Sequence, residues 1–357
     1  MLTETFSQTK ADAFADKIVN ILNCGSLALV ISIGHRTGLF DSLSSLPPST
    51  SQAIAHTTRL SERYVREWLG AMVTGGIISY DPTEATYHLP KEHAAFLTRA
   101  AAPDNLAVFA QYISVLGQVE DKIIDCFLHG GGVPYEEFHR FHQVMAEDSG
   151  QTVVAALEEY ILPLIPGLVN KLKRGIDVLD VGCGSGRAII KLAKLFPDSN
   201  FVGFDFSSET ITRANQEVEE NGLSNVQFKV MDATQLQEEN RYDLITTFDA
   251  VHDQADPATV LRGIARALKV DGIYLMQDIA TSSHVHLNID HPIGPFLYTI
   301  STMHCMTVSL AQGGAGLGTC WGKEKAIEML HDAGFNKVDV EQLAHDIQNY
   351  YYIVRKV

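Results

Sequence analysis

The residues with the clearest chemical potential form a glycine loop behind an apolar segment. Residues 176–181 have the sequence IDVLDV and predict a buried strand, followed by Gly182, Gly184 and Gly186 and by a helix predicted over residues 187–195. Glycine lets the backbone turn sharply and approach a ligand closely, because no Cβ stands in the way. The spacing G-x-G-x-G differs from the G-x-G-x-x-G of dinucleotide sites, and no G-K-[ST] of a phosphate loop follows. The loop therefore predicts a ligand site at the carboxyl edge of a parallel sheet.

Acidic residues lie close to the same predicted edge. Asp180 precedes the loop, Asp205 ends a second predicted strand (NFVGFDFS), and Asp232 ends a third (VQFKVMDAT). A carboxylate at the position of Asp205 could accept hydrogen bonds from both hydroxyls of a ribose. Two acids at consecutive strand ends suit a cationic sulfonium ligand better than a pyrophosphate.

The segments VLDVGCGSGR, FVGFDFS and FKVMDAT, taken in order, resemble the class I S-adenosylmethionine-dependent methyltransferases over residues 172–278. The resemblance implies an α/β fold with a Rossmann-like seven-stranded sheet, S-adenosyl-L-methionine as cofactor and methyltransferase activity. It also implies that the glycine loop holds the methionine end, Asp205 the ribose and Asp232 the adenine amino group. The implied cofactor residues are Asp180, Gly182, Gly184, Gly186, Asp205, Phe206, Asp232, Ala233 and Phe248.

A histidine follows the fourth predicted strand. The segment TFDAVHDQADP places His252 and Asp253 at the same edge of the sheet, and Asp278 ends the fifth strand. Transfer of a methyl group to a hydroxyl requires a base, and imidazole titrates near neutral pH. The segment is similar to small-molecule O-methyltransferases, two-domain dimers with winged-helix N-termini. That similarity implies His252 as base, oriented by Asp278 or Asp253, although Gln254 stands where a Trp is usual.

The role of base has a competing interpretation, because many class I methyltransferases carry a histidine here that only packs or contacts the cofactor. Sulfur and nitrogen acceptors also stay open, since a thiolate or an amine needs less help from a base. We expect transfer to oxygen on a small, partly apolar molecule. The sequence does not identify that molecule.

The length of the chain predicts two domains to position these residues, because 357 residues are more than one hydrophobic core usually organises. We expect a helical N-terminal domain over residues 1–165, which dimerises and roofs the substrate pocket, and a methyltransferase domain over residues 166–357. Residues 51–89 predict helix, turn, helix and a two-stranded wing around DPTEA. The second of these helices has as many acids as bases, which favours a structural module over a DNA-binding one.

A long insertion between the fifth strand and the next helix covers residues 281–322. Such connections are commonly lids or binding loops, so we expect a cap over the acceptor pocket that closes against the helices at 104–145. Its histidines, His284, His286, His291 and His304, lack a carboxylate cluster, and we predict no metal site.

Composition limits the remaining classes of function. A net charge of −16 opposes binding to nucleic acid. No secretory signal and no uninterrupted run of 18 apolar residues is found, so we predict no membrane span. Five widely spaced cysteines fit a cytoplasmic protein with free thiols. Two alternatives to a methyltransferase stay open. One is a winged-helix regulator that senses S-adenosylmethionine, and the other is a dinucleotide-dependent oxidoreductase.

Overall fold

The chain folds into two compact units that meet between Val115 and Leu116. The computed structural model describes residues 6–356. The boundary expected at residue 165 lies well inside the second unit. The reason is that Val153, Leu157 and Ile161 bury their side chains in the core of the methyltransferase-like unit, so this helical segment belongs there.

The first unit contains the predicted winged helix. Its helices and strands are α1 (Gln8–Thr37), α2 (Leu39–Ser45), α3 (Ser51–Thr58), α4 (Glu62–Thr74), β1 (Ser79–Asp81), β2 (Thr86–His88) and α5 (Lys91–Leu97). Strands β1 and β2 pair antiparallel and form the wing. The core is apolar, and in it the rings of Phe40 and Trp68 meet edge to face with their centroids 5.3 Å apart.

The arginines of α4 are paired within the helix. Arg63 contacts Glu67, and Arg66 lies 3.4 Å from Glu62. Each pair spans one helical turn, so the acids offset the charge that a DNA backbone would attract. This pairing agrees with the expectation of a structural module.

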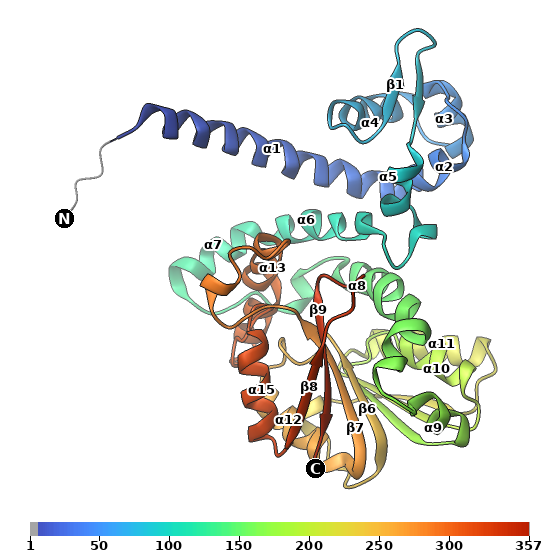
Figure 1. The fold of residues 1–357 in the computed structure, drawn as a ribbon, viewed down its shortest axis with the longest axis vertical. Coiled ribbons are helices and arrows are strands. Elements are labelled where there is room, and N and C mark those ends of the chain that lie inside the picture. Colours follow the sequence, from blue (N-terminus) through green and yellow to red (C-terminus); the bar gives the residue numbers. More distant parts are fainter. Residues whose placement is uncertain (1–5, 357) are drawn as a thin grey trace. The chain divides into compact units, whose positions relative to one another are not determined.

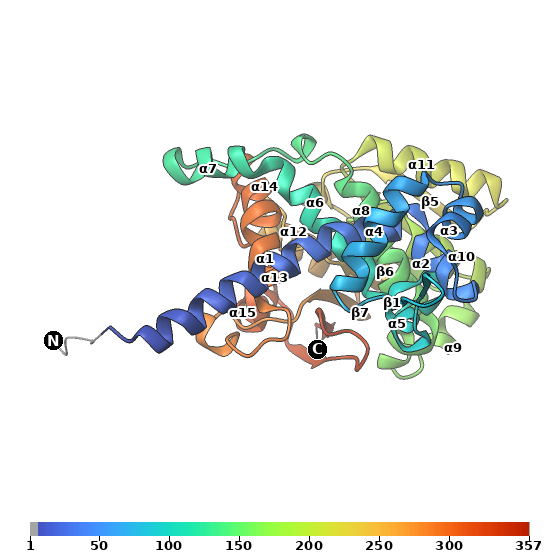
Figure 2. The ribbon, with the colours of Figure 1, turned by 90° about the horizontal axis from the view of Figure 1, so that it is seen from above.

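Helix α1 is long (Figures 1 and 2) and apolar, and many of its side chains are exposed. An 18-residue window has a mean hydropathy of 1.6 and is 17% buried, so by length and composition alone α1 could cross a membrane. The criterion of 18 uninterrupted apolar residues does not detect this helix, because Asn20, Asn23 and Ser26 lie within its apolar stretch. These three residues are polar but carry no charge. Exposed apolar side chains on this helix include Phe14, Val19, Leu22 and Ile33.

The second unit is built on a seven-stranded sheet in the order β5-β4-β3-β6-β7-β9-β8. Strand β9 runs antiparallel to both of its neighbours, and the pairs from β5 to β7 are parallel. The expected seven-stranded α/β fold is therefore confirmed. The strands are β3 (Asp177–Val181), β4 (Asn200–Asp205), β5 (Val226–Val230), β6 (Tyr242–Phe248), β7 (Leu268–Ile279), β8 (Lys337–Glu341) and β9 (Asn349–Arg355).

Helices cover both faces of this sheet (Figure 1). One face packs against α9 (Leu168–Arg174), α10 (Arg187–Leu195) and α11 (Ser208–Glu220). The other packs against α12 (Pro257–Ala267) and α15 (Gly322–Asp332). The cores on the two faces are separate, as expected for strands buried on both sides.

Two helical segments complete this unit. The first follows α6 (Ala110–Leu116) and contains α7 (Glu120–His129), η4 (Tyr135–Glu137), α8 (Phe141–Ser149) and two π-helical turns, η5 (Gly150–Val154) and η6 (Leu157–Ile161). The second is the insertion between β7 and α15, which is largely helical. It contains α13 (Gly294–Ile300), η10 (Ser301–Cys305) and α14 (Met306–Ala311) (Figure 2).

Candidate active site

A cavity lies at the carboxyl ends of β3, β4 and β6, where parallel α/β sheets bind ligands. It gathers many of the residues that the glycine loop and the strand ends predict. The predicted cofactor residues that line it are Asp180, Gly182, Gly184, Asp205, Phe206 and Phe248.

The glycines of the loop meet different demands. Gly182 has φ 73°, and a Cβ there would lie 2.6 Å from the Cβ of Ala250. Gly184 has φ 53° and open space beside it, which leaves room for a ligand. Gly186 lies outside the cavity lining, and a Cβ there would meet the ring of Phe228 at 2.3 Å, so its small size serves packing.

Asp205 links the second strand to the glycine loop. Its Oδ2 accepts a hydrogen bond from the backbone N–H of Gly184 at 2.9 Å, and its Oδ1 accepts one from the N–H of Ser207 at 2.9 Å. A carboxylate has about four acceptor sites, so each oxygen can still accept from a ligand. Hydrogen bonds from hydroxyl groups to a carboxylate are short and charge-assisted, so the hydroxyls of a ribose suit this position.

Asp180 is a buried acid below the loop. Its Oδ1 accepts a hydrogen bond from the hydroxyl of Thr246 at 2.7 Å. Burial raises the pKa of Asp180 to about 7; the Thr246 bond opposes this rise and the Asp205 carboxylate adds to it. A cationic ligand would supply the missing positive charge and favour the carboxylate form. The acids and the glycine loop thus fit a cationic nucleoside such as S-adenosylmethionine.

Besides Gly186, two predicted cofactor residues lie outside the cavity lining. Asp232 is exposed and caps a short helix, where its Oδ1 accepts from the N–H of Thr234 at 2.8 Å. Ala233 packs into the core on the face of α12. Their roles toward adenine remain predictions from the resemblance.

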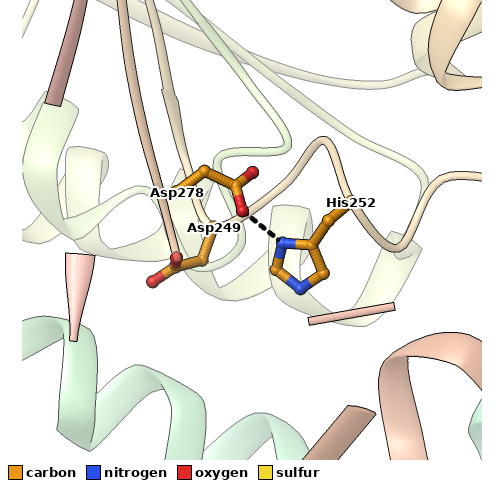
Figure 3. Close-up of side chains that lie close together, drawn as sticks. All are labelled: Asp249, His252 and Asp278. Atoms are coloured by element: carbon orange, nitrogen blue, oxygen red, sulfur yellow. Dashed lines mark hydrogen bonds and ion pairs between the residues drawn. The ribbon is translucent and has the colours of Figure 1, made fainter. Parts of the chain in front are cut away.

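His252 and Asp278 form a buried pair (Figure 3). The Nδ1 of His252 lies 2.8 Å from Oδ1 of Asp278, and the two residues are 3% and 0% exposed. The same oxygen accepts from the N–H of Ile279 at 2.8 Å and from the indole Nε1 of Trp321 at 3.0 Å. Because a carboxylate only accepts, Nδ1 carries the proton, and Nε2 is the nitrogen that can take another. Cys305 is a second hydrogen-bond partner of the imidazole.

The pair sets the basicity of the imidazole. Burial disfavours the charged imidazolium, but the Asp278 carboxylate and the Cys305 thiol outweigh it, so the pKa of His252 is well above its ordinary value. A raised pKa makes Nε2 a stronger proton acceptor once it is neutral. The arrangement can therefore remove a proton from a hydroxyl group.

Asp253, the other acid offered as an orienting group, takes a different position. It lines the cavity, and its Oδ1 lies 3.4 Å from Nε2 of Gln254. Burial raises the pKa of Asp253 to about 6; His252 opposes this rise, and Asp278 and Asp205 add to it. Of the two acids, Asp278 is the hydrogen-bond partner of the histidine.

Sequence reasoning missed several residues at this site. Tyr135, His142 and Met145 reach the cavity from η4 and α8, where helical periodicity gave no sign of a site. His304 of the insertion stacks on Phe141 with a centroid distance of 3.5 Å. Trp321 was the least visible, since only the folded chain brings it to Asp278.

One group in the described part of the chain has the residue types of a metal site, namely Asp249, His252 and Asp278 (Figure 3). One potential ligand atom of each lies within 4.8 Å of the others. However, Nδ1 of His252 and Oδ1 of Asp278 already bind each other. A metal ion bound to either atom would break the hydrogen bond between His252 and Asp278.

Two families of domain match the chain. Residues 25–99 match the model described as "Rv2258c-like winged HTH domain", and residues 172–349 match the model described as "Methyltransferase domain". The two matches agree with the helix–turn–helix and wing of the first unit and with the sheet of the second.

Curated relatives match part of the chain. Human EEF1A lysine methyltransferase 2 is 34% identical over 116 residues, which cover 30% of this chain and 49% of that protein. Sterol 24-C-methyltransferase erg6 of Aspergillus fumigatus is 29% identical over 205 residues, covering 57% of this chain and 50% of the relative. The chain thus spans about half the length of these relatives.

Solved structures match nearly the whole chain. A putative O-methyltransferase from Nostoc punctiforme has a TM-score of 0.71 at 20% identity and covers 95% of this chain and 98% of its own. Human N-acetylserotonin methyltransferase in complex with SAM has a TM-score of 0.68 at 16% identity, with both chains fully covered. At these identities the likeness establishes the two-domain fold.

Proposed function

This chain carries a class I S-adenosylmethionine-dependent methyltransferase domain behind a winged helix-turn-helix domain, and we propose that it transfers a methyl group to an oxygen atom of a small molecule. The observation that carries the proposal is the buried His252–Asp278 pair, whose neighbours Asp249 and Asp253 line the cofactor cavity. Oδ1 of Asp278 binds Nδ1 of His252 and also accepts hydrogen bonds from Ile279 and Trp321. A histidine with a packing role alone would not require a carboxylate held in place in this way.

S-adenosyl-L-methionine is the cofactor, and when bound it supplies an electrophilic methyl group on sulfur. We propose that the glycine loop holds its methionine end and Asp205 its ribose, with Asp180 balancing its positive charge. Phe206 and Phe248 would flank the adenosine. These residues bind and orient the reactants, which is most of what an in-line displacement requires.

His252 is the proposed general base. Its Nε2 takes the proton of the acceptor hydroxyl as the oxygen forms its new bond to carbon, and the imidazolium formed is stabilised by Asp278. The indole of Trp321 and the N–H of Ile279 fix the carboxylate, so the imidazole ring keeps its orientation. Burial of the pair excludes water from the reacting atoms.

The insertion at residues 281–322 is proposed to cap the acceptor pocket. Its Thr307 accepts a hydrogen bond from the N–H of Val133 at 2.8 Å. His304 lies against Phe138 as well as Phe141, with centroids 4.7 Å apart in the first pair. These contacts join the insertion to the segment that lines the cavity from η4 and α8.

We also propose a cytoplasmic homodimer, with α1 as the dimerising helix. The exposed apolar side chains of α1, which include Val19 and Leu22, would be covered by a second copy. Cys24, Cys126, Cys183, Cys305 and Cys320 are free thiols, in keeping with a reducing compartment.

The test is a screen of phenols, catechols, thiols and amines with labelled S-adenosylmethionine and the full chain. Methyl ethers of phenols or catechols are expected as products. Products formed only from thiols or amines would move the proposal to another acceptor class. Folded protein that binds neither S-adenosylmethionine nor S-adenosylhomocysteine would overturn it.

A further inference from the structure

Buried polar atoms without partners gather beside the His252–Asp278 pair. Oδ1 of Asp249, Oδ2 of Asp278 and both polar atoms of the Gln277 side chain have no hydrogen-bond partner among the described residues. Gln277 is 1% exposed and Asp278 is 0% exposed. Leaving such atoms unpaired costs about 1–3 kcal/mol each, so a ligand that donates hydrogen bonds is the expected partner.

Asp249 and Asp278 come together at the ends of neighbouring strands, while the side chain of Gln277 points to the face of the sheet opposite to Asp278. Asp249 follows β6, and its backbone N–H donates to the carbonyl oxygen of Gln277 on β7 at 3.0 Å. Asp249 has φ 51°, a left-handed conformation that few non-glycine residues adopt. Asp249 also lines the cofactor cavity, so its carboxyl group lies within reach of a bound molecule.

The local charge favours a cation. Burial is the main cause that raises the pKa of Asp249 well above its ordinary value; Asp278, Asp148 and Asp346 raise it further, and only His252 opposes them. Three carboxylates and one imidazole therefore act on this carboxyl group. A ligand with a positive charge would restore the charged form of Asp249.

The hydrogen bond already present favours an ammonium group over a metal ion. Ligand atoms of Asp249, His252 and Asp278 lie within 4.8 Å of one another, which leaves room for an ammonium nitrogen whose acceptor oxygens lie about 4.6 Å apart. An ammonium also donates hydrogen bonds without displacing Nδ1 of His252 from Asp278.

We propose that the methyl acceptor carries a protonated amino group, which Asp249 binds together with the free oxygen of Asp278. This inference rests on the proposed function, since it names the class of acceptor for the same site. The amino group anchors the molecule, and the hydroxyl to be methylated lies toward Nε2 of His252.

The experiment uses three phenols that differ only in the charge of the side chain. Tyramine, 4-ethylphenol and 3-(4-hydroxyphenyl)propanoate are titrated calorimetrically into the full chain saturated with S-adenosylhomocysteine. We expect tyramine to bind at least about tenfold more tightly than 4-ethylphenol, because a charge-assisted hydrogen bond contributes that much. The propanoate should bind most weakly.

The variant Asp249→Asn should reduce the preference for tyramine to about threefold or less, because the charge is lost while asparagine tolerates φ > 0. The exposed Asp332→Asn is the matched control and should keep the wild-type preference. Equal binding of tyramine and 4-ethylphenol by the wild type would overturn the inference. So would binding of Zn²⁺ or Mn²⁺ that depends on Asp249, without a preference for the amine.

Methyl transfer, measured on the same compounds, separates this inference from the proposed function. Equal rates of O-methylation for tyramine and 4-ethylphenol would refute the amine anchor and leave O-methylation standing. A preference for tyramine in binding that Asp249→Asn removes, without methyl transfer to oxygen, would support the anchor and refute transfer to oxygen. Methyl transfer to the nitrogen of tyramine would overturn both, because that nitrogen must then be neutral and lie at the reacting methyl group.

Discussion

Trp321 lies 43 residues beyond Asp278 in the sequence, yet its indole Nε1 donates to Oδ1 of Asp278 at 3.0 Å. That oxygen is the one that accepts from Nδ1 of His252. The end of the insertion is thereby tied to the proposed base. The end of the insertion thus fixes the carboxylate that binds the imidazole.

Replacement of this indole should change the basicity of His252. Trp321→Phe removes one donor from Asp278, which leaves more negative charge to stabilise the imidazolium, so the pKa of His252 rises further. The rise of kcat/KM with pH is expected at a higher pH, with about a three- to tenfold lower kcat near neutral pH.

Trp68→Phe is the matched control, since Trp68 is the other tryptophan and donates to the carbonyl of Val30 at 2.7 Å in the first unit. Its pH profile should equal that of the wild type. The same shift in both variants would show that Trp321 acts only through general stability.

The carboxylate itself should have the opposite effect on the pH profile. Methyl transfer requires neutral His252, so the wild-type rate rises as the pH increases through a pKa above the ordinary range of histidine. Asp278→Asn removes the charge that opposes burial, so this rise moves to lower pH while kcat falls by about 100-fold or more. An unshifted profile measured by steady-state kinetics would contradict the pair.

Asp205→Ala tests the ribose site. Loss of its charge-assisted hydrogen bonds should weaken S-adenosylmethionine binding by about 2–4 kcal/mol in calorimetric titration. The exposed Asp332→Ala should bind the cofactor as the wild type does. Equal affinity of the Asp205 variant and the wild type would mean that the ribose lies elsewhere.

Asp180 predicts a pH dependence of cofactor affinity. Its pKa is raised to about 7 in the free protein, and a cationic ligand favours the charged form. Binding must therefore release a proton below pH 7, and affinity should fall as the pH decreases from 8 to 6. The apparent enthalpy should also vary with the ionisation enthalpy of the buffer, and Asp180→Asn should remove both effects.

The exposed face of α1 predicts the oligomeric state. Val19 and Leu22 are 57% and 65% exposed, so burying them in a dimer would contribute favourable apolar contacts. The double variant Val19→Glu with Leu22→Glu should sediment as a monomer, while the wild type sediments as a dimer. A monomeric wild type would contradict the proposed dimer.

Local patterns predicted the fold and the cofactor loop because their causes are local. The glycines between residues 182 and 186 and the apolar runs before them depend on turn geometry and strand burial, which act over a few residues. Asp278 as partner of His252 followed from the resemblance to O-methyltransferases, which left Asp253 as an alternative. The domain boundary failed because helix periodicity does not say which core a helix joins.

Other residues could not be found from spacing. Trp321 meets Asp278 only because the insertion folds back onto β7, and Tyr135 reaches the cavity from a segment far from the glycine loop in sequence. Asp249 was overlooked because its unpaired oxygen and positive φ are properties of the folded chain. Long-range packing decides all three positions.

Methyl transfer by His252→Asn, measured with labelled S-adenosylmethionine and the best phenolic acceptor of the screen, tests the central claim most directly. Binding of S-adenosylhomocysteine is measured in parallel to show that the cofactor site is intact. We expect kcat to fall by about 100-fold or more, with cofactor affinity preserved. A variant that methylates the phenol at the wild-type rate would contradict the role of His252 as base.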